Sequence, residues 1–175
     1  MRIRNKEQRV FEKITFVLAL AGIVIVPSCR QQPAAPSQPS PAAAEVYAPG
    51  LGEIMTLQQM RHTKLWLAGQ AKNWDLAGYE MDELGEGFDD VLKFHPTHKD
   101  SPVAPKDAIP RMVPEPLAEL RAAVEKKDTA AFESAYDKLT AACNSCHDAM
   151  NFGFNKVQRP RDNPYPNQVF APVQR

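Results

Sequence analysis

The stretch FESAYDKLTAACNSCHDAM, residues 132–150, combines a helical repeat of apolar side chains with two closely spaced cysteines. The repeat runs at intervals of three and four residues through Phe132, Tyr136, Leu139, Cys143, Cys146 and Met150. Such spacing places these side chains along one face of an α-helix. The stretch therefore predicts a helix whose apolar face carries two thiols, with His147 directly after the second.

The cysteines and the histidine together form the pattern Cys-x-x-Cys-His, which is the attachment sequence for c-type haem. Two thiols on one helical turn match the spacing of the two vinyl groups, with which they form thioethers. The adjacent histidine is then presented to the iron as an axial ligand. The sequence predicts one covalent haem c, held by Cys143 and Cys146 and ligated by His147.

Three other uses of the cysteine pair are weaker. A thioredoxin-like redox pair sits at the start of a helix after a strand, whereas a long helical segment precedes Cys143. A structural zinc site needs four ligands, and His62, His95 and His98 would have to complete it because no second cysteine pair exists. A disulfide at this spacing would strain a helix, so haem attachment is favoured.

The N-terminus has the pattern of an export signal. Basic residues up to Lys13 precede the uninterrupted apolar run ITFVLALAGIVIV, residues 14–26, which is too short for a comfortable transmembrane helix. A small residue, Ser28, then stands directly before Cys29, as in the lipobox of bacterial lipoproteins. We therefore expect residues 1–28 to be a signal peptide and Cys29 to become the lipidated first residue.

Residues 29–50 are rich in Pro, Ala, Ser and Gln and hold almost no large apolar side chains. Such a segment cannot bury enough surface to fold, so it predicts a disordered tether. Haem attachment to Cys-x-x-Cys-His takes place outside the cytoplasm, which agrees with export. The expected location is therefore the periplasm of a bacterium, with the protein anchored to the membrane through its lipid.

The charge balance points away from nucleic acid as a partner. The whole chain holds 21 basic and 21 acidic residues, and the signal peptide takes five of the former and two of the latter. Its removal leaves a net charge of −3, and a mildly acidic chain has no general attraction for phosphate backbones. The expected partners are instead redox proteins and, through the lipid, the membrane.

Residues 51–155 read as almost wholly helical, and they predict an all-α fold. Helices are expected at 51–72, at 74–94 behind an Asn73 cap, and at about 115–126. A last helix follows a cap at Asp128 or Thr129. The proline-broken segment 95–114 is expected to be a long connection, and residues 156–175 an extended tail rich in Pro and Arg. These helices predict an antiparallel four-helix bundle.

A signal sequence, four helices and the motif Cys143-Asn144-Ser145-Cys146-His147 in the last helix resemble the class II c-type cytochromes. This family contains cytochrome c-prime and its low-spin, methionine-ligated relatives. The resemblance covers residues 51–155. It implies that Cys143 and Cys146 hold the haem, that His147 is the proximal ligand, and that a homodimer can form through the first two helices.

The resemblance also implies where the distal ligand lies. In the low-spin relatives a methionine near the start of the first helix ligates the iron, and Met55 occupies that place here. His62, two turns later on the same face, is the alternative ligand, and Met60 is a lesser one. Trp66 and Tyr136 are expected to contact the cofactor as pocket walls. His95 and His98 are expected to be solvated loop residues.

Two functions follow from these alternatives. A haem ligated by His147 and Met55 predicts electron transfer, because methionine sulfur favours ferrous iron and raises the potential. An iron without a distal ligand predicts binding of a small gas, NO or CO, as in cytochrome c-prime. We expect the protein not to be an enzyme.

Overall fold

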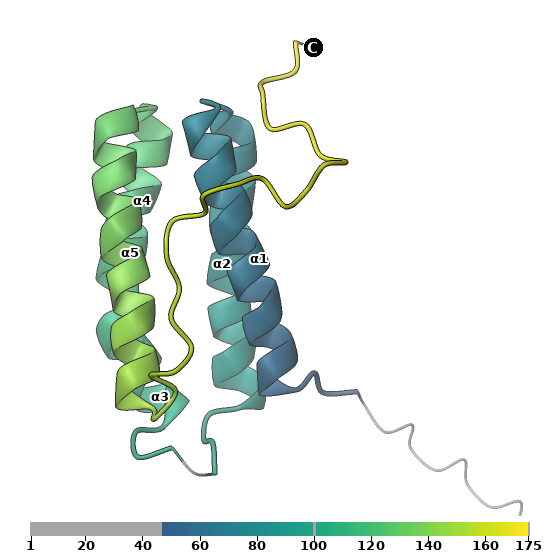
Figure 1. Ribbon diagram of the computed structural model, residues 1–175. Helices are drawn as coiled ribbons and strands as arrows, with labels where there is room; N and C mark the ends of the chain where they lie inside the picture. The colour runs from purple at the N-terminus through teal and green to yellow at the C-terminus, as the bar shows by residue number, and fades with distance from the viewer. Residues whose placement is uncertain (1–46, 100, 175) are drawn as a thin grey trace, which may run out of the picture. The chain divides into compact units, whose positions relative to one another are not determined.

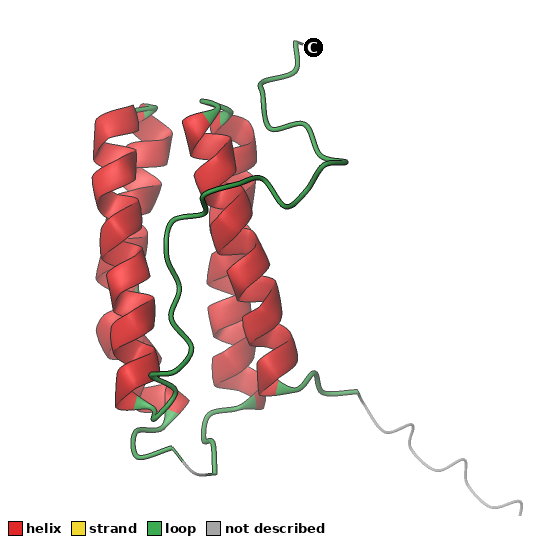
Figure 2. Ribbon diagram, viewed as in Figure 1, coloured by secondary structure: helices red, strands yellow, loops and turns green. Residues whose placement is uncertain are grey.

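The computed structural model describes residues 47–99 and 101–174. The predicted signal peptide, Cys29 and the tether up to residue 46 lie outside the described residues. Within the described ranges all regular structure is helical, and they contain no strand (Figure 2). The prediction of an all-α fold is therefore confirmed.

Four long helices and one short helix make up the domain: α1 (Leu51–Gln70), α2 (Trp74–Phe94), α3 (Pro105–Met112), α4 (Pro114–Lys126) and α5 (Thr129–Ala149). The antiparallel pair α1 and α2 forms one hairpin, and α4 and α5 form a second beside it (Figure 1). Short α3 lies at the end of the domain where α5 finishes. No helix among the described residues is both long and apolar enough to cross a membrane.

Side-chain caps fix where two of the long helices begin. The side chain of Asn73 accepts a hydrogen bond from the amide of Leu76 at 3.2 Å, before α2. The side chain of Asp128 does the same for the amide of Ala131 at 3.0 Å, before α5. Each bond satisfies a backbone donor that lacks a partner in the first turn. The cap before α5 is therefore Asp128, not Thr129.

The segment 95–114 is not the simple connection that its prolines predicted, because it contains α3. Pro105 and Pro114 each occupy the first turn of a helix, where the missing amide hydrogen removes no helical bond. Only Pro110 stands inside a helix. The short helix buries Ala108 and Ile109, so packing against neighbouring helices offsets the weak local propensity.

The core divides into two main apolar clusters along the helices. The larger one occupies the end where α1 meets α2, and its biggest buried side chains are Leu65, Trp66, Met81, Leu120, Phe132, Tyr136 and Leu139. A second cluster lies toward the start of α1 and consists of Ile54, Phe88, Val91, Ile109 and Val113. The candidate site, described below, borders both clusters.

Residues 156–174 form an extended segment, the C-terminal strap, that runs beside α5 and then passes over α1 (Figure 1). The strap is docked on the helices. The guanidinium of Arg159 stacks 4.3 Å from the ring centroid of Trp66 and forms two hydrogen bonds with the Asp137 carboxylate. Phe170, near its end, is buried in the larger cluster. The predicted extended tail is therefore part of the folded domain.

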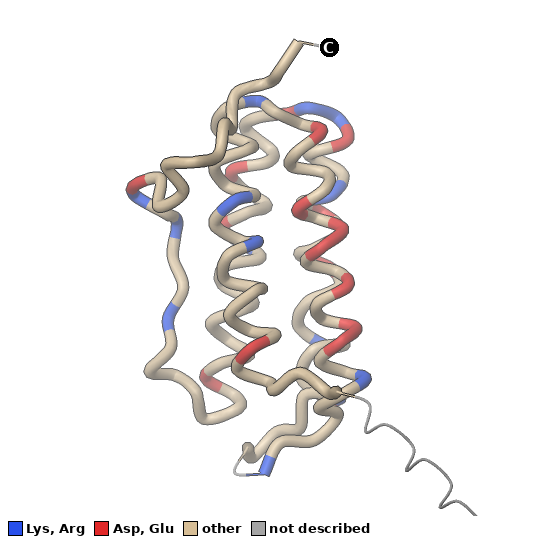
Figure 3. The backbone as a smooth tube through the Cα atoms, turned by 90° about the vertical axis from the view of Figure 1, so that its right-hand side faces the viewer, with Lys and Arg blue, Asp and Glu red and all other residues tan. Residues whose placement is uncertain are grey.

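Charged side chains are distributed unevenly over the surface. Acidic residues follow one another along α2, whereas Lys156, Arg159 and Arg161 make the strap basic (Figure 3). Ion pairs from Arg61 to Glu83 and from Arg159 to Asp137 neutralise part of each region. The charges thus stabilise the positions of α2 and of the strap against their neighbours.

Replacement of Gly69 by Ala tests the tightest packing in the core. A Cβ at this position would collide with ring carbons of Phe132, which is fully buried. We expect Gly69→Ala to lower the free energy of unfolding by about 1–3 kcal/mol, as overpacking does. Urea denaturation of the full chain measures the change.

Gly78→Ala is the matched control, because it makes the same exchange within a helix where no atom lies within 4 Å of the added Cβ. Relief of glycine's backbone entropy should raise the free energy of unfolding there by about 0.5–1 kcal/mol. Equal effects of the two substitutions would contradict the packing described here.

Candidate functional site

A cavity of about 280 Å³ lies among α1, α2, α5, the short helix and the start of the strap. Five of the residues that the sequence singled out line it: Met55, His62, Cys143, Cys146 and His147. The first two come from α1 and the other three from α5. Residues almost ninety positions apart in the chain thus meet at one site. The volume is close to the lower end of the range for ligand pockets, roughly 300–1,000 Å³.

The remaining walls of the cavity are mostly apolar. They include Leu84, Phe88, Val91, Ile109, Val113, Leu139 and Met150. Most of these side chains are buried and belong to the two main core clusters or, for Met150, to a small third one. Such walls favour a largely apolar ligand with a few fixed polar or sulfur contacts.

The two thiols lie one turn apart on α5, and neither forms a disulfide. Burial, and then the neighbouring Cys146, raises the pKa of the Cys143 thiol to about 12. Burial also raises the pKa of the Cys146 thiol, whose Sγ lies 3.6 Å from the sulfur of Met150. Both groups therefore stay protonated at neutral pH. Redox-active cysteine pairs have lowered pKa values instead, so this environment disfavours dithiol exchange.

His147 has one ring nitrogen in a hydrogen bond, and the other has no hydrogen-bond partner among residues 47–99 and 101–174. Its Nδ1 lies 2.5 Å from the backbone carbonyl of Asn155. A carbonyl oxygen only accepts, so Nδ1 carries the hydrogen and donates it. The other nitrogen, Nε2, then keeps its lone pair. This arrangement is the one in which a histidine ligates a metal while its second nitrogen is held by an outer partner.

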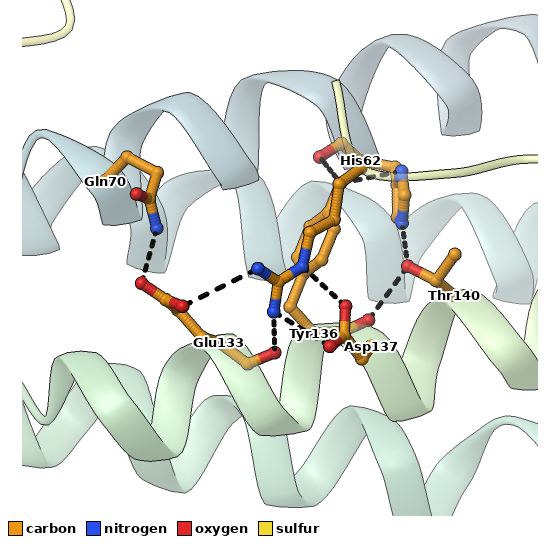
Figure 4. A network of polar contacts seen from close by, with 7 residues as sticks. His62, Gln70, Glu133, Tyr136, Asp137 and Thr140 are labelled. Carbon is orange, nitrogen blue, oxygen red and sulfur yellow. Dashed lines mark hydrogen bonds and ion pairs between the residues drawn. The ribbon is translucent and has the colours of Figure 1, made fainter. Parts of the chain in front are cut away.

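His62 is joined to α5 by a closed set of hydrogen bonds (Figure 4). The Thr140 hydroxyl donates to the carbonyl of Tyr136, so its oxygen accepts from Nε2 of His62 at 2.9 Å. The Tyr136 hydroxyl lies 2.9 Å from Nδ1 of His62 and donates to it, sharing its hydrogen with the His62 carbonyl. The two rings also stack, with centroids 4.4 Å apart.

These partners fit a neutral imidazole. One nitrogen donates and the other accepts, which uses the whole hydrogen-bonding capacity of an uncharged ring. Because His62 is only 5 % exposed, burial lowers its pKa to about 4. Ligation of a metal by His62 would therefore first require loss of its bond to Thr140 or to Tyr136.

The other expected site residues occupy different places. Trp66 and Tyr136 do not line the cavity; they are packed in the larger core cluster, and Tyr136 is connected to the site through His62. His98 does line it, with its ring 5.6 Å from that of Phe152. His95 donates to the carbonyl of Pro49 at 2.7 Å. Neither of these loop histidines is simply solvated.

Among the described residues no group of three or more His, Cys, Asp or Glu side chains is arranged to hold a metal ion. A haem differs in its demands from a bare ion, because its own ring supplies most of the coordination. The protein contributes only axial ligands. Of the residues that line the cavity, His147 through Nε2 and Met55 through its sulfur are the candidate axial ligands.

The buried His62 predicts a specific pH dependence of stability. In the unfolded chain it binds a proton near its ordinary pKa of 6.5, and in the folded protein only near 4. Between these values the unfolded state holds more protons, so the free energy of unfolding rises with pH and then levels off above 6.5. The total rise is on the order of 3 kcal/mol.

Denaturation at a series of pH values, compared between the native chain and His62→Gln, isolates this contribution. The two curves should diverge as the pH increases from 4 to 6.5 and run parallel above it. Parallel curves throughout would show that His62 titrates normally in the folded protein.

Comparisons of the sequence with protein-family models and with curated proteins, and of the fold with solved structures, find no match. The chemistry of the cavity therefore has to be argued from the residues that line it. The most specific of these are Cys143, Cys146 and His147, because their spacing and their common orientation toward one apolar cavity select few ligands.

Proposed function

We propose that the protein is a monohaem c-type cytochrome of the class II kind, exported and tethered to a membrane, that transfers electrons between redox partners. On this proposal the four long helices are the family's antiparallel four-helix bundle. Cys143 and Cys146 carry one haem c through thioethers, and His147 is the proximal ligand. Met55 is the distal ligand.

The observation that carries the proposal is the meeting of these four side chains in one cavity. Two thiols one turn apart, an imidazole with a free Nε2 and a methionine sulfur from another helix all line it. The donor set is the one that a haem with histidine and methionine ligands requires. The apolar walls suit the porphyrin faces.

The protein's own groups prepare the site. A bound haem would supply the one-electron chemistry. The hydrogen bond from His147 to the Asn155 carbonyl orients the imidazole and increases its basicity. The neutral His62 closes the cavity toward Tyr136 without adding a charge. The apolar walls would keep most of the surroundings of a bound haem non-polar, which would limit reorganisation when an electron arrives or leaves.

The sequence before the domain agrees with this function. An export signal over residues 1–28, a lipid on Cys29 and a Pro- and Ala-rich tether would hold the domain near a membrane in the periplasm. There, covalent haem attachment takes place and membrane-bound redox proteins are within reach. We propose such proteins as partners, and a homodimer through α1 and α2 is compatible with the family.

A second function, binding of NO or CO, is favoured by one observation. The wall that α2 contributes is apolar and consists of Leu84, Phe88 and Val91, whereas α1 adds the polar residues Thr56, Gln58 and Gln59 beside Met55 and His62. Met55 has a flexible side chain and is only partly buried. An iron that Met55 left free would face an apolar pocket suited to a small gas.

Optical spectra of the protein with and without Met55 distinguish the two functions. We expect the native ferric and ferrous protein to be low-spin and nearly unaffected by carbon monoxide. Met55→Ala should become high-spin and bind carbon monoxide at once, because the sixth ligand is lost. A pyridine haemochrome spectrum first establishes whether haem c is attached at Cys143 and Cys146.

Met60→Ala is the matched control, since Met60 is also a partly buried methionine of α1 but does not line the cavity. Its spectrum should equal the native one. A native protein that is high-spin and binds carbon monoxide would favour the gas-binding function. A Met55→Ala protein that stays low-spin would indicate that His62, and not Met55, is the distal ligand. Absence of covalent haem would exclude both functions.

The lipid anchor is tested separately. Cys29→Ala should prevent lipidation and shift the protein from the membrane fraction to the soluble periplasmic fraction, with its haem content unchanged. Incorporation of labelled palmitate into the native chain but not into the variant measures the modification. Equal labelling, or equal distribution between the fractions, would contradict a lipid at Cys29.

A further inference from the structure

Asn144, between the two cysteines, forms a clamp on the polypeptide that follows α5. Its Nδ2 donates to the backbone carbonyl of Val157, and its Oδ1 accepts from the amide of the same residue, both at 2.9 Å. The side chain is partly buried. Its amide group donates one hydrogen bond and accepts one, as a peptide group does when it pairs with a neighbouring β-strand. The clamp therefore fixes the backbone at Val157 in both position and orientation.

The clamped segment is the one that holds His147. The carbonyl that accepts from Nδ1 of His147 belongs to Asn155, two residues before Val157. Asn144 and His147 are three residues apart on α5, so their side chains emerge from neighbouring positions on the helix. One short piece of backbone thus forms three hydrogen bonds with neighbouring α5 side chains: its carbonyls accept two of them, and the Val157 amide donates the third.

We propose that Asn144 is a positioning residue: through Val157 it holds the Asn155 carbonyl against Nδ1 of His147 and so tunes the proximal ligand. The inference rests on the proposed function and adds a determinant of its redox potential. Neither Asn144 nor the strap belongs to the attachment chemistry, which uses only the two thiols and the free imidazole nitrogen.

The physical consequence concerns the electron density on Nε2. A hydrogen bond from Nδ1 to a carbonyl makes the imidazole more basic, and a more basic ligand stabilises ferric over ferrous iron. His147 is partly exposed, so without a fixed acceptor its Nδ1 would exchange between water and the carbonyl. A rigid acceptor therefore keeps the potential lower than a mobile one would.

The other anchors of the strap act elsewhere. Arg159 binds Asp137, which lies more than a turn before Asn144 on α5. It also stacks on Trp66, which belongs to α1. Phe170 is buried still farther along the strap. Nearer the carbonyl, Lys156 pairs with Asp148, but both side chains of this ion pair are exposed, so its contribution is small. The Asn155 amide also donates to the Phe152 carbonyl at 2.8 Å, and this bond fixes the peptide group before Asn155, not the one that carries its carbonyl.

The test compares the purified full-length protein with Asn144→Ala and Asn144→Asp. Alanine removes both bonds, whereas aspartate keeps the acceptor for the Val157 amide and loses the donor, with almost no change in shape. Asn167→Ala is the matched control, because it removes an exposed strap asparagine. Amide exchange at Val157 reports directly whether each variant has opened the clamp.

We expect the midpoint potential to rise in Asn144→Ala, and by less in Asn144→Asp, and to be unchanged in Asn167→Ala. In NMR of the ferrous protein, the ring N–H of His147 should exchange faster with solvent in the same order. The absorption spectrum should remain low-spin in all of them, because Nε2 and Met55 are untouched.

An unchanged potential and unchanged ring exchange, in a variant whose Val157 amide has become exposed, would overturn the inference. Protein without covalent haem would overturn the proposed function instead. In that case the nitrogen chemical shifts of labelled histidine still test the clamp, because they show which ring nitrogen carries the hydrogen. The inference is supported if His147 carries its hydrogen on Nδ1 in the native chain and no longer does so in Asn144→Ala. It is refuted if the two proteins do not differ. His62 should give the opposite, Nε2–H, tautomer in both and serves as an internal reference.

Discussion

The hydrogen bonds of His62 with Tyr136 and Thr140 join α1 to α5 at the boundary between the closely packed core and the cavity. Most of the packing of α1 is on α2 and most of that of α5 is on α4, and α1 meets α5 mainly in the aromatic core, where Trp66 packs on Phe132 and Tyr136. On one side of the bonds the aromatic core is closely packed, as the absence of space beside Gly69 shows. On the other side the helices are separated by the cavity. The position of the candidate site therefore follows from the place of one buried, neutral histidine.

Much of the helical fold could be predicted because its signals are local. The caps Asn73 and Asp128 and the regular spacing of apolar residues give the starts of α2 and α5 to within a residue. The short helix α3 could not be predicted in the same way. A proline is favourable in the first turn of a helix and unfavourable in the middle of one, and α3 contains both cases. Its stability comes from burial of Ala108 and Ile109 by elements that are distant in the sequence.

In the candidate site, too, some features could be predicted from local sequence and others could not. Cys143, Cys146 and His147 are recognisable from spacing alone, since one helical turn presents all three. The docking of the strap, and hence the partner of His147, depends on contacts that no periodic pattern records. Tyr136 illustrates a related limit: an aromatic residue on an apolar face can line a cavity or fill a core, and only the register between helices decides which.

The two-hairpin architecture has a consequence for the order of assembly. The contacts between α1 and α2 join helices that follow each other in the sequence. The first hairpin can therefore form quickly once both helices have been synthesised. The thiols and the strap come later in the chain. On the proposed function, a haem would therefore be attached when a partner helix is already in place and the proximal side is still open. Docking of the strap on α5 would then cover the proximal side after the haem has been attached.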